Sequence, residues 1–164
     1  MNHPIPSGSG PSFSPDETLT CWCDAEVLLD GPFSLPVTLA FHYVADQPYS
    51  VRMAVHTDSA PPVEWVFARD LLMEGLRRPA GLGDVQVWPA PRRAHQLEAG
   101  GGAVHIRISS PDGTTVLSTP ARPLRGFVAR TLEEVPSGAE TDRLHVDESL
   151  SAWVAEGRTE DGTL

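Results

Sequence analysis

The sequence contains no lysine, and all twelve of its basic side chains are arginines. The absence of lysine excludes the phosphate-binding lysine of a P-loop and a Schiff-base lysine. With 22 acidic residues the formal net charge is −10. A general binder of nucleic acids or anionic membranes gains its sequence-independent affinity by neutralising phosphates, so this charge disfavours both functions.

Cysteine and long apolar runs are also scarce. Cys21 and Cys23 flank Trp22, and on an extended strand they would lie on one face, too far apart for an unstrained disulfide. We expect two reduced thiols with a packing role. The histidines show no metal-ligand spacing, so we expect neither a metal nor a cofactor. No window approaches the ~18 apolar residues of a membrane span, and no signal peptide is recognisable, which predicts a cytoplasmic protein without membrane insertion.

The 164 residues predict one domain. Residues 1–17 are rich in proline, serine and glycine and predict a disordered tail. The following segment, 18–120, holds seven short runs with alternating apolar residues, which predict an antiparallel sheet with one buried face. These runs are 19–29, 35–44, 50–57, 63–68, 84–89, 103–109 and 114–119. Ser110-Pro111-Asp112-Gly113 fits a type I turn and predicts a hairpin.

The period then lengthens to that of helices over 121–157. Leu124, Phe127, Val128 and Leu132 predict an amphipathic helix that ends before Pro136. A second helix is predicted from Asp147 to Gly157, with Leu150, Trp153 and Val154 on one face, and 158–164 is predicted to be flexible. A short helix is expected over 69–76. The fold class is therefore α+β, with about seven strands flanked by short helices.

The sequence contains few motifs that are typical of catalytic or nucleotide-binding sites. No Gly-x-Ser-x-Gly elbow lies between a strand and a helix, and Gly81 and Gly83 precede a strand, the reverse of a dinucleotide-binding turn. Two arginine pairs near a tryptophan could form a stacking and phosphate-contacting patch for single strands, or could belong to solvated loops. These residues are Arg77, Arg78, Trp88, Arg92 and Arg93. The net charge favours solvated loops.

Several short motifs stand out in the segment after residue 60. The longest is EWVFARDLL at 64–72, and it is followed by EGL at 74–76, GDV at 83–85 and VWP at 87–89. Further motifs are ISSPDG at 108–113, PAR at 120–122, VPSG at 135–138 and DESL at 147–150. Together these motifs resemble those of the SsgA-like family of cell-division regulators in sporulating actinobacteria. The resemblance covers about residues 18–156. The tail and the long loop 90–102 depart from the family pattern.

The resemblance implies a non-enzymatic protein that marks septum sites and recruits the tubulin-like ring protein FtsZ, with help from an SsgA-type paralogue. It also implies a barrel-like sheet similar to that of the whirly single-stranded nucleic-acid-binding proteins, assembled as a homotrimer. The alternative function is therefore a single-stranded nucleic-acid-binding module. Salt dependence would separate the two, because phosphate binding weakens steeply with added salt.

The block 64–72 and Gly138 are the candidate interaction residues. Trp65, Phe67, Leu71 and Leu72 are expected to form core or trimer contacts. The functional hypothesis places Glu64, Arg69 and Asp70 on the surface, where they bind a partner. Gly138 follows Pro136-Ser137 in a predicted tight turn, and a positive φ there would exclude other side chains. A side chain at 138 would then misplace the acidic C-terminal helix.

Overall fold

The computed structural model describes residues 18–91 and 101–143. The predicted tail 1–17, the helix predicted over 147–157 and the C-terminal residues 158–164 lie outside the described residues. The same is true of Arg92 and Arg93.

The described chain forms one sheet of seven strands in the order β4-β3-β2-β1-β7-β6-β5, and every neighbouring pair is antiparallel. Each predicted run is a strand. The bounds are β1 Thr18–Leu28, β2 Ser34–Val44, β3 Ser50–Thr57, β4 Ala60–Ala68, β5 Val85–Pro89, β6 Ala103–Ser110 and β7 Gly113–Pro120. Pro61 and Pro62 lengthen β4 beyond the predicted run. They lie on an edge strand, at the point where the register with β3 shifts between Val55 and Thr57, and edges and irregularities of this kind accept proline.

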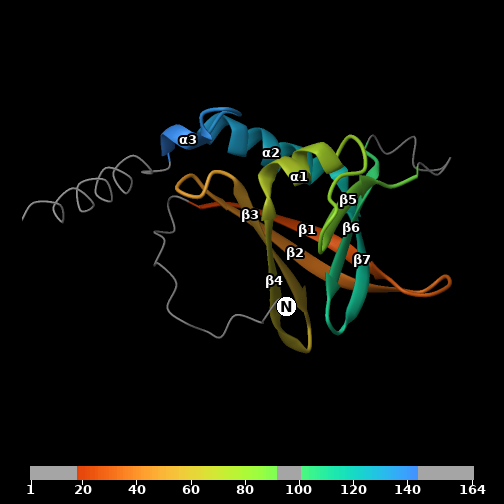
Figure 1. The fold of residues 1–164 in the computed structure, drawn as a ribbon. Coiled ribbons are helices and arrows are strands. Elements are labelled where there is room, and N and C mark those ends of the chain that lie inside the picture. The colour runs from red at the N-terminus through yellow and green to blue at the C-terminus, as the bar shows by residue number, and fades with distance from the viewer. Residues whose placement is uncertain (1–17, 92–100, 144–164) are drawn as a thin grey trace, which may run out of the picture.

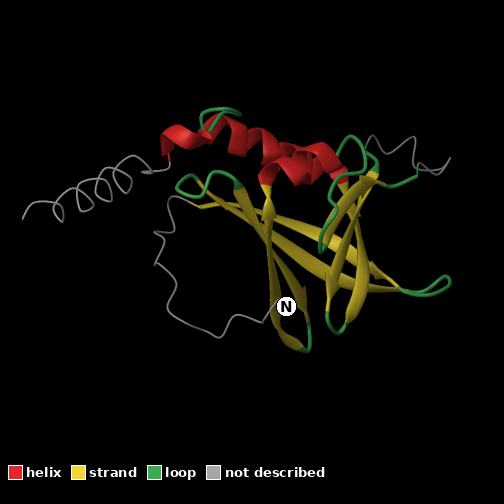
Figure 2. Ribbon diagram, in the orientation of Figure 1, coloured by secondary structure: helices red, strands yellow, loops and turns green. Residues whose placement is uncertain are grey.

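The sheet curls into a half-barrel. Strands β1–β4 and strands β5–β7 form two groups, and these groups are joined only by a short pairing between β1 and β7. Strand β1 pairs with β2 from Thr18 to Leu28, but it pairs with β7 only from Glu26 to Leu28. The strands therefore diverge toward one end of the molecule, where the helices lie (Figure 1). The helices are α1 Arg69–Gly75, α2 Ala121–Glu134 and α3 Glu140–Arg143, and Figure 2 shows all three above the sheet.

The core fills the space between the curled sheet and α2. Leu39, Phe41 and Ile106 are fully buried on the strands, and Leu124 is fully buried on α2. The rings of Phe41 and Phe127 lie 6.1 Å apart. Burial of each large apolar side chain stabilises the fold by about 1.5–3 kcal/mol. The amphipathic helix predicted from Leu124 to Leu132 is therefore confirmed, as is the short helix that begins at Arg69.

The two cysteines are free thiols on the core side of β1. Their Sγ atoms are 3.6 Å apart, and the thiol of Cys21 donates to the carbonyl oxygen of Pro123 at 3.7 Å. Burial, with a further contribution from Cys21, raises the pKa of the Cys23 thiol to about 12. A protonated, buried thiol is a poor nucleophile, which agrees with the predicted packing role.

Candidate interaction site

Arg69 occupies the first position of α1, directly after the edge strand β4. Phe67 is buried on β4, and two residues later the side chain of Arg69 also points inward and is only 1% exposed. The N–H of Arg69 donates to the carbonyl oxygen of Tyr49 at 2.7 Å, which fixes the start of the helix to the β2–β3 connection. The alternation of inward and outward side chains along β4 thus places a guanidinium group in the protein interior.

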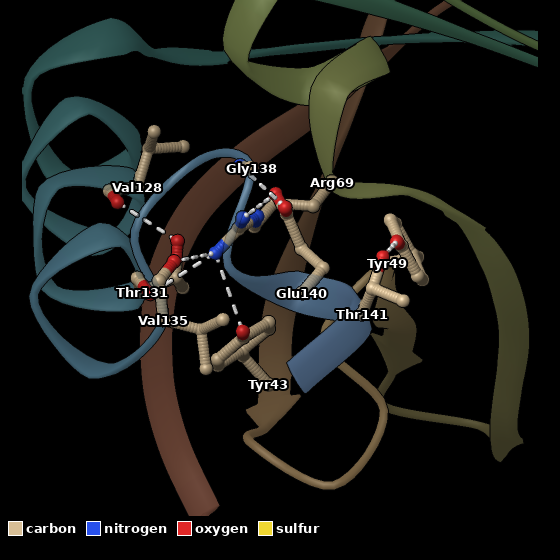
Figure 3. A network of polar contacts seen from close by, with 9 residues as sticks. All are labelled: Tyr43, Tyr49, Arg69, Val128, Thr131, Val135, Gly138, Glu140 and Thr141. Atoms are coloured by element: carbon tan, nitrogen blue, oxygen red, sulfur yellow. Dashed lines mark hydrogen bonds and ion pairs between the residues drawn. The ribbon is translucent and has the colours of Figure 1, made fainter. Parts of the chain in front are cut away.

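Four acceptors surround this guanidinium group (Figure 3). Nη1 donates to the hydroxyl of Tyr43 at 3.2 Å and to the carbonyl oxygens of Thr131 at 3.1 Å and Val135 at 2.7 Å. Nη2 donates to Oε1 of Glu140 at 2.5 Å. Thr131 lies in the last turn of α2 and Val135 directly follows this helix, at the end where the helix dipole favours a cation. Arg69 therefore caps α2 and pairs with α3 at the same time.

Glu140 completes the cluster from the other side. Its Oε2 accepts a hydrogen bond from the backbone N–H of Gly138 at 2.5 Å. The pKa of Glu140 is lowered, first by its own backbone N–H, and further by the N–H of Gly138 and by Arg69, against an opposing effect of burial. Gly138 has a φ of +90°, so the positive φ expected for this glycine is confirmed. We call Tyr43, Arg69, Thr131, Gly138 and Glu140 the Arg69 cluster.

A second contact ties the same region to the sheet. The hydroxyl groups of Tyr49 and Thr141 are 2.9 Å apart, which joins the β2–β3 connection to α3. Within α2, the hydroxyl of Thr131 donates to the carbonyl oxygen of Val128 at 2.8 Å. The Arg69 cluster and the Tyr49–Thr141 contact together fix the position from which the acidic sequence after Arg143 continues.

The structure corrects the prediction for Arg69. An exposed partner-binding role is wrong, because the side chain is buried and saturated with acceptors on its own chain. Glu64 and Asp70 are exposed, as the functional hypothesis requires. Asp70 lies beside the Arg69 cluster on α1. Glu64 lies in the middle of β4 on the face opposite to the buried Phe67, so the fold does not bring it to Gly138.

The apolar part of the block 64–72 behaves as core. Phe67 and Leu72 are buried, and Trp65 and Leu71 are partly buried against the core. No local sequence pattern indicates that Tyr43, Thr131 and Glu140 meet Arg69. The one available signal was the turn at 136–138 followed closely by an acidic residue, a pattern that many surface loops share.

The arginines of the nucleic-acid hypothesis do not form a patch in the described chain. Arg77 and Arg78 are exposed beyond the end of α1, and Arg78 forms an ion pair with Glu74. Trp88 on β5 is half-buried, and its ring meets the edge of His105 at 5.7 Å. A stacking platform needs an exposed aromatic face beside free cations, and these residues do not present one.

Three further features of residues 18–91 and 101–143 concern metal binding, grooves and membrane insertion. The described residues hold no group of three or more histidine, cysteine or acidic side chains arranged to bind a metal ion. An open groove of about 530 Å³ is lined by Asp24, Glu26, His56 and Asp58 together with backbone and small side chains. In the described part of the chain no helix has both the length and the apolar character needed to cross a bilayer.

Comparison with known proteins extends over most of the chain. Residues 37–140 match the family model described as Streptomyces sporulation and cell division protein, SsgA. The sporulation-specific cell division protein SsgB of Streptomyces coelicolor is 44% identical over 139 residues, which cover 85% of this chain and 97% of the relative. The chain belongs to the SsgA family. The SsgB protein of Kineococcus radiotolerans is 45% identical over 125 residues, or 76% of this chain and 72% of the relative.

Solved structures of SsgA family proteins show the same fold. One, described as "Mutations in SsgB correlate to longitudinal cell division during sporulation of Streptomyces coelicolor", has a TM-score of 0.70 at 42% identity and covers 77% of this chain and 95% of its own. The SsgA-like sporulation-specific cell division protein of Thermobifida fusca has a TM-score of 0.70 at 33% identity, covering 83% of this chain and 95% of its own. The predicted antiparallel, barrel-like sheet with short helices is therefore confirmed.

Proposed function

We propose that this protein is a non-enzymatic regulator of sporulation-specific cell division that marks septum sites and recruits or positions FtsZ there. The observation that carries the proposal is the similarity to SsgB over 97% of that relative's length. The structure is compatible with this role, because the central charged cluster is used to hold the fold together and not to face a substrate. Such a protein acts through its surfaces.

The surface around the Arg69 cluster is the first candidate for partner binding. Asp70 is exposed next to the cluster, and Gly138 and Glu140 hold the start of α3, which ends at Arg143. Between Gly138 and the C-terminus there are seven acidic residues and two arginines. We expect FtsZ or an SsgA-type paralogue to contact this surface, with Glu64 on the opposite sheet face as a separate contact.

Self-association into a homotrimer belongs to the same proposal. Trp65 on the edge strand β4 and Leu71 on α1 are partly exposed, and an edge strand offers free backbone groups to a second copy. Sedimentation equilibrium of the purified protein measures the oligomeric state directly. A monomer at all accessible concentrations would contradict the trimer but would leave FtsZ binding open.

Co-sedimentation with polymerising FtsZ in the presence of GTP tests the main proposal. We expect the full chain to pellet with FtsZ polymers and to remain soluble without them. Asp70→Asn should reduce the pelleted fraction, whereas Asp112→Asn, a change at an exposed carboxylate in the β6–β7 turn, is the matched control. Absence of the protein from the pellet at saturating FtsZ would refute recruitment by direct contact.

Single-stranded DNA titrated at low salt provides the parallel assay for the alternative function. The ion pair of Arg78 and the contact of the half-buried Trp88 ring with His105 argue against binding of single-stranded DNA. DNA binding that falls steeply with added salt, together with no association with FtsZ, would support the nucleic-acid-binding module instead.

A further inference from the structure

The turn between β1 and β2 exposes an unusual concentration of large apolar side chains. Phe33 is 70% exposed, Leu35 51%, Leu29 50% and Leu28 37%. These four belong to nine large apolar side chains that are exposed in the described part of the chain, and they all lie within eight consecutive residues. We call residues 28–35 the apolar hairpin tip. Single exposed apolar residues are normal, but a contiguous group is typical of an interaction site.

The apolar hairpin tip continues the row of inward-facing apolar residues, or apolar stripe, of β1 and β2 into a part of the hairpin where these side chains are exposed. Cys23, Ala25, Val37 and Leu39 face the interior and are buried. The same alternation places Leu29, Phe33 and Leu35 on that inner face. The hairpin extends away from the helices (Figure 1), and the pairing of β1 with β7 ends at Leu28. The stripe therefore emerges from the core with no element of the described chain covering it.

The tip is nevertheless well ordered by its backbone. The N–H of Leu29 donates to the carbonyl oxygen of Phe33 at 3.1 Å, and Gly31 adopts a φ of +81°, a conformation that closes the turn and that glycine favours. Continuous pairing from Thr18 to Leu28 with β2 supports it from below. A preformed tip loses little conformational entropy when it binds, which favours affinity.

The charged residues in the chain segment around the tip are all acidic. Asp24, Glu26 and Asp30 are the charged residues between positions 24 and 39, and this stretch contains no arginine or histidine. The turns of the other two hairpins at this end of the molecule carry Asp58 and Asp112 (Figure 1). Arg107, which the register places two strands from Leu28, shares the outer sheet face with Asp24 and Glu26. On the side of Leu29 and Phe33, the carboxylates are therefore those of the turns.

We propose that the apolar hairpin tip docks into an apolar cleft of a partner protein, and that arginine or lysine side chains border this cleft. The tip supplies the apolar anchors, of which Phe33 is the most exposed, and the surrounding carboxylates select a basic rim. Two copies of this tip would bring like charges together, and an anionic lipid surface would repel the same carboxylates. This docking surface lies at the end of the sheet far from the Arg69 cluster, so it is separate from the surface proposed above.

Site-specific photo-crosslinking tests the proposal in the cells that produce the full chain. A photoreactive phenylalanine analogue replaces Phe33, and in the control it replaces Leu82, which is fully exposed in a different loop. We expect an adduct to a single protein from position 33 and none from position 82. The crosslinked partner peptide, sequenced by mass spectrometry, should be apolar with neighbouring arginine or lysine residues. A lipid adduct, a peptide of this chain itself, an acid-flanked peptide or no adduct would overturn the proposal.

The purified partner domain then gives a quantitative readout. Leu29→Asp and Leu35→Asp should each weaken binding about tenfold or more, as expected for anchor residues, and Asp30→Arg should slow association. Thermal unfolding shows whether the variants fold, and these exposed positions should leave the melting temperature nearly unchanged. Unchanged affinity in folded Leu29→Asp protein would refute the anchor role.

Discussion

The two ends of α1 each carry an arginine–glutamate ion pair in very different surroundings. At the start, Arg69 and Glu140 have side chains 1% and 8% exposed and come from distant parts of the sequence. Beyond the end, Arg78 and Glu74 are 74% and 45% exposed and lie four residues apart. Arg69 also donates to Tyr43, Thr131 and Val135, whereas the guanidinium group of Arg78 donates to Glu74.

The difference shows that the surroundings of an ion pair decide its role. An exposed pair is screened by water and contributes little to stability. A buried pair has already lost its hydration, so removal of one partner leaves a charge or several carbonyls without compensation. Arg69 therefore acts as a structural crosslink among the sheet, α1, α2 and α3, whereas Arg78 forms an exposed ion pair that contributes little to stability.

The largest effect is expected from Arg69→Met. The variant keeps an apolar stem of similar length but loses the four hydrogen bonds and the contact of the guanidinium group with the Tyr43 ring. We expect the free energy of unfolding to fall by about 3–5 kcal/mol, as for other broken buried ion pairs. Urea unfolding of the purified protein measures this change. A loss below about 1 kcal/mol would show that the cluster is not a structural crosslink.

A smaller effect is expected from Gly138→Ala. A Cβ at this position meets nothing within 4 Å, so the cost comes from the positive φ alone and should be about 1–2 kcal/mol. If the backbone relaxes, the N–H of residue 138 turns away from Glu140 and α3 shifts. We expect weaker FtsZ co-sedimentation with a protein that is still folded at 25 °C. Gly126→Ala, in an α2 position that is also open, is the control.

Normal FtsZ recruitment by Gly138→Ala would separate Gly138 from partner binding. It would leave the Arg69 cluster with a structural role only.

Acidification should weaken the Arg69 cluster at a defined point. Because the pKa of Glu140 is lowered from 4.5, its contribution is complete above pH 4.5 and is lost as the pH falls through the lower, folded-state value. Burial lowers the pKa of His42 and His105 from 6.5, so the protein should also lose stability as the pH falls below 6.5. Thermal unfolding between pH 7 and pH 3 measures both steps.

Glu140→Gln separates the two steps. The variant should share the loss below pH 6.5, because both histidines remain, but its stability difference from the unmodified protein should shrink below pH 4.5. A difference that stays constant down to pH 3 would be inconsistent with an ionised Glu140 in the cluster.

The smallest effect is expected from Arg78→Met. This change is the counterpart of Arg69→Met on the exposed ion pair and should alter the free energy of unfolding by less than about 0.5 kcal/mol. The same urea experiment measures it. A loss that approaches the effect of Arg69→Met would remove the contrast between the two ends of α1.

Much of the fold could be predicted from local patterns. The alternation of Val104, Ile106 and Ile108 gave a strand with one buried face, and the spacing of Leu124, Phe127 and Val128 gave α2. Both patterns arise from the fixed periods of strand and helix, which are properties of neighbouring residues. The positive φ of Gly138 was also predictable, because a turn after proline and serine limits the choice of residue.

The candidate site was only partly predictable. Glu64 and Asp70 were correctly expected on the surface, but Arg69 was expected beside them and is buried. An arginine is usually exposed, and its burial depends on acceptors from Tyr43, 26 residues earlier, and Glu140, 71 residues later. Single-sequence patterns carry no information on such pairings.

Local patterns are sufficient to predict the strands, the first two helices, the reduced cysteines and the motifs that mark the SsgA family. These features depend on side-chain periodicity and on short stretches of chain. Two other features arise only in the folded chain: Arg69 crosslinks three helices to the sheet, and the apolar stripe of β1 and β2 becomes exposed at Leu29 and Phe33. Both depend on which distant segments meet after folding, because burial is a property of the whole packed chain and not of any one segment.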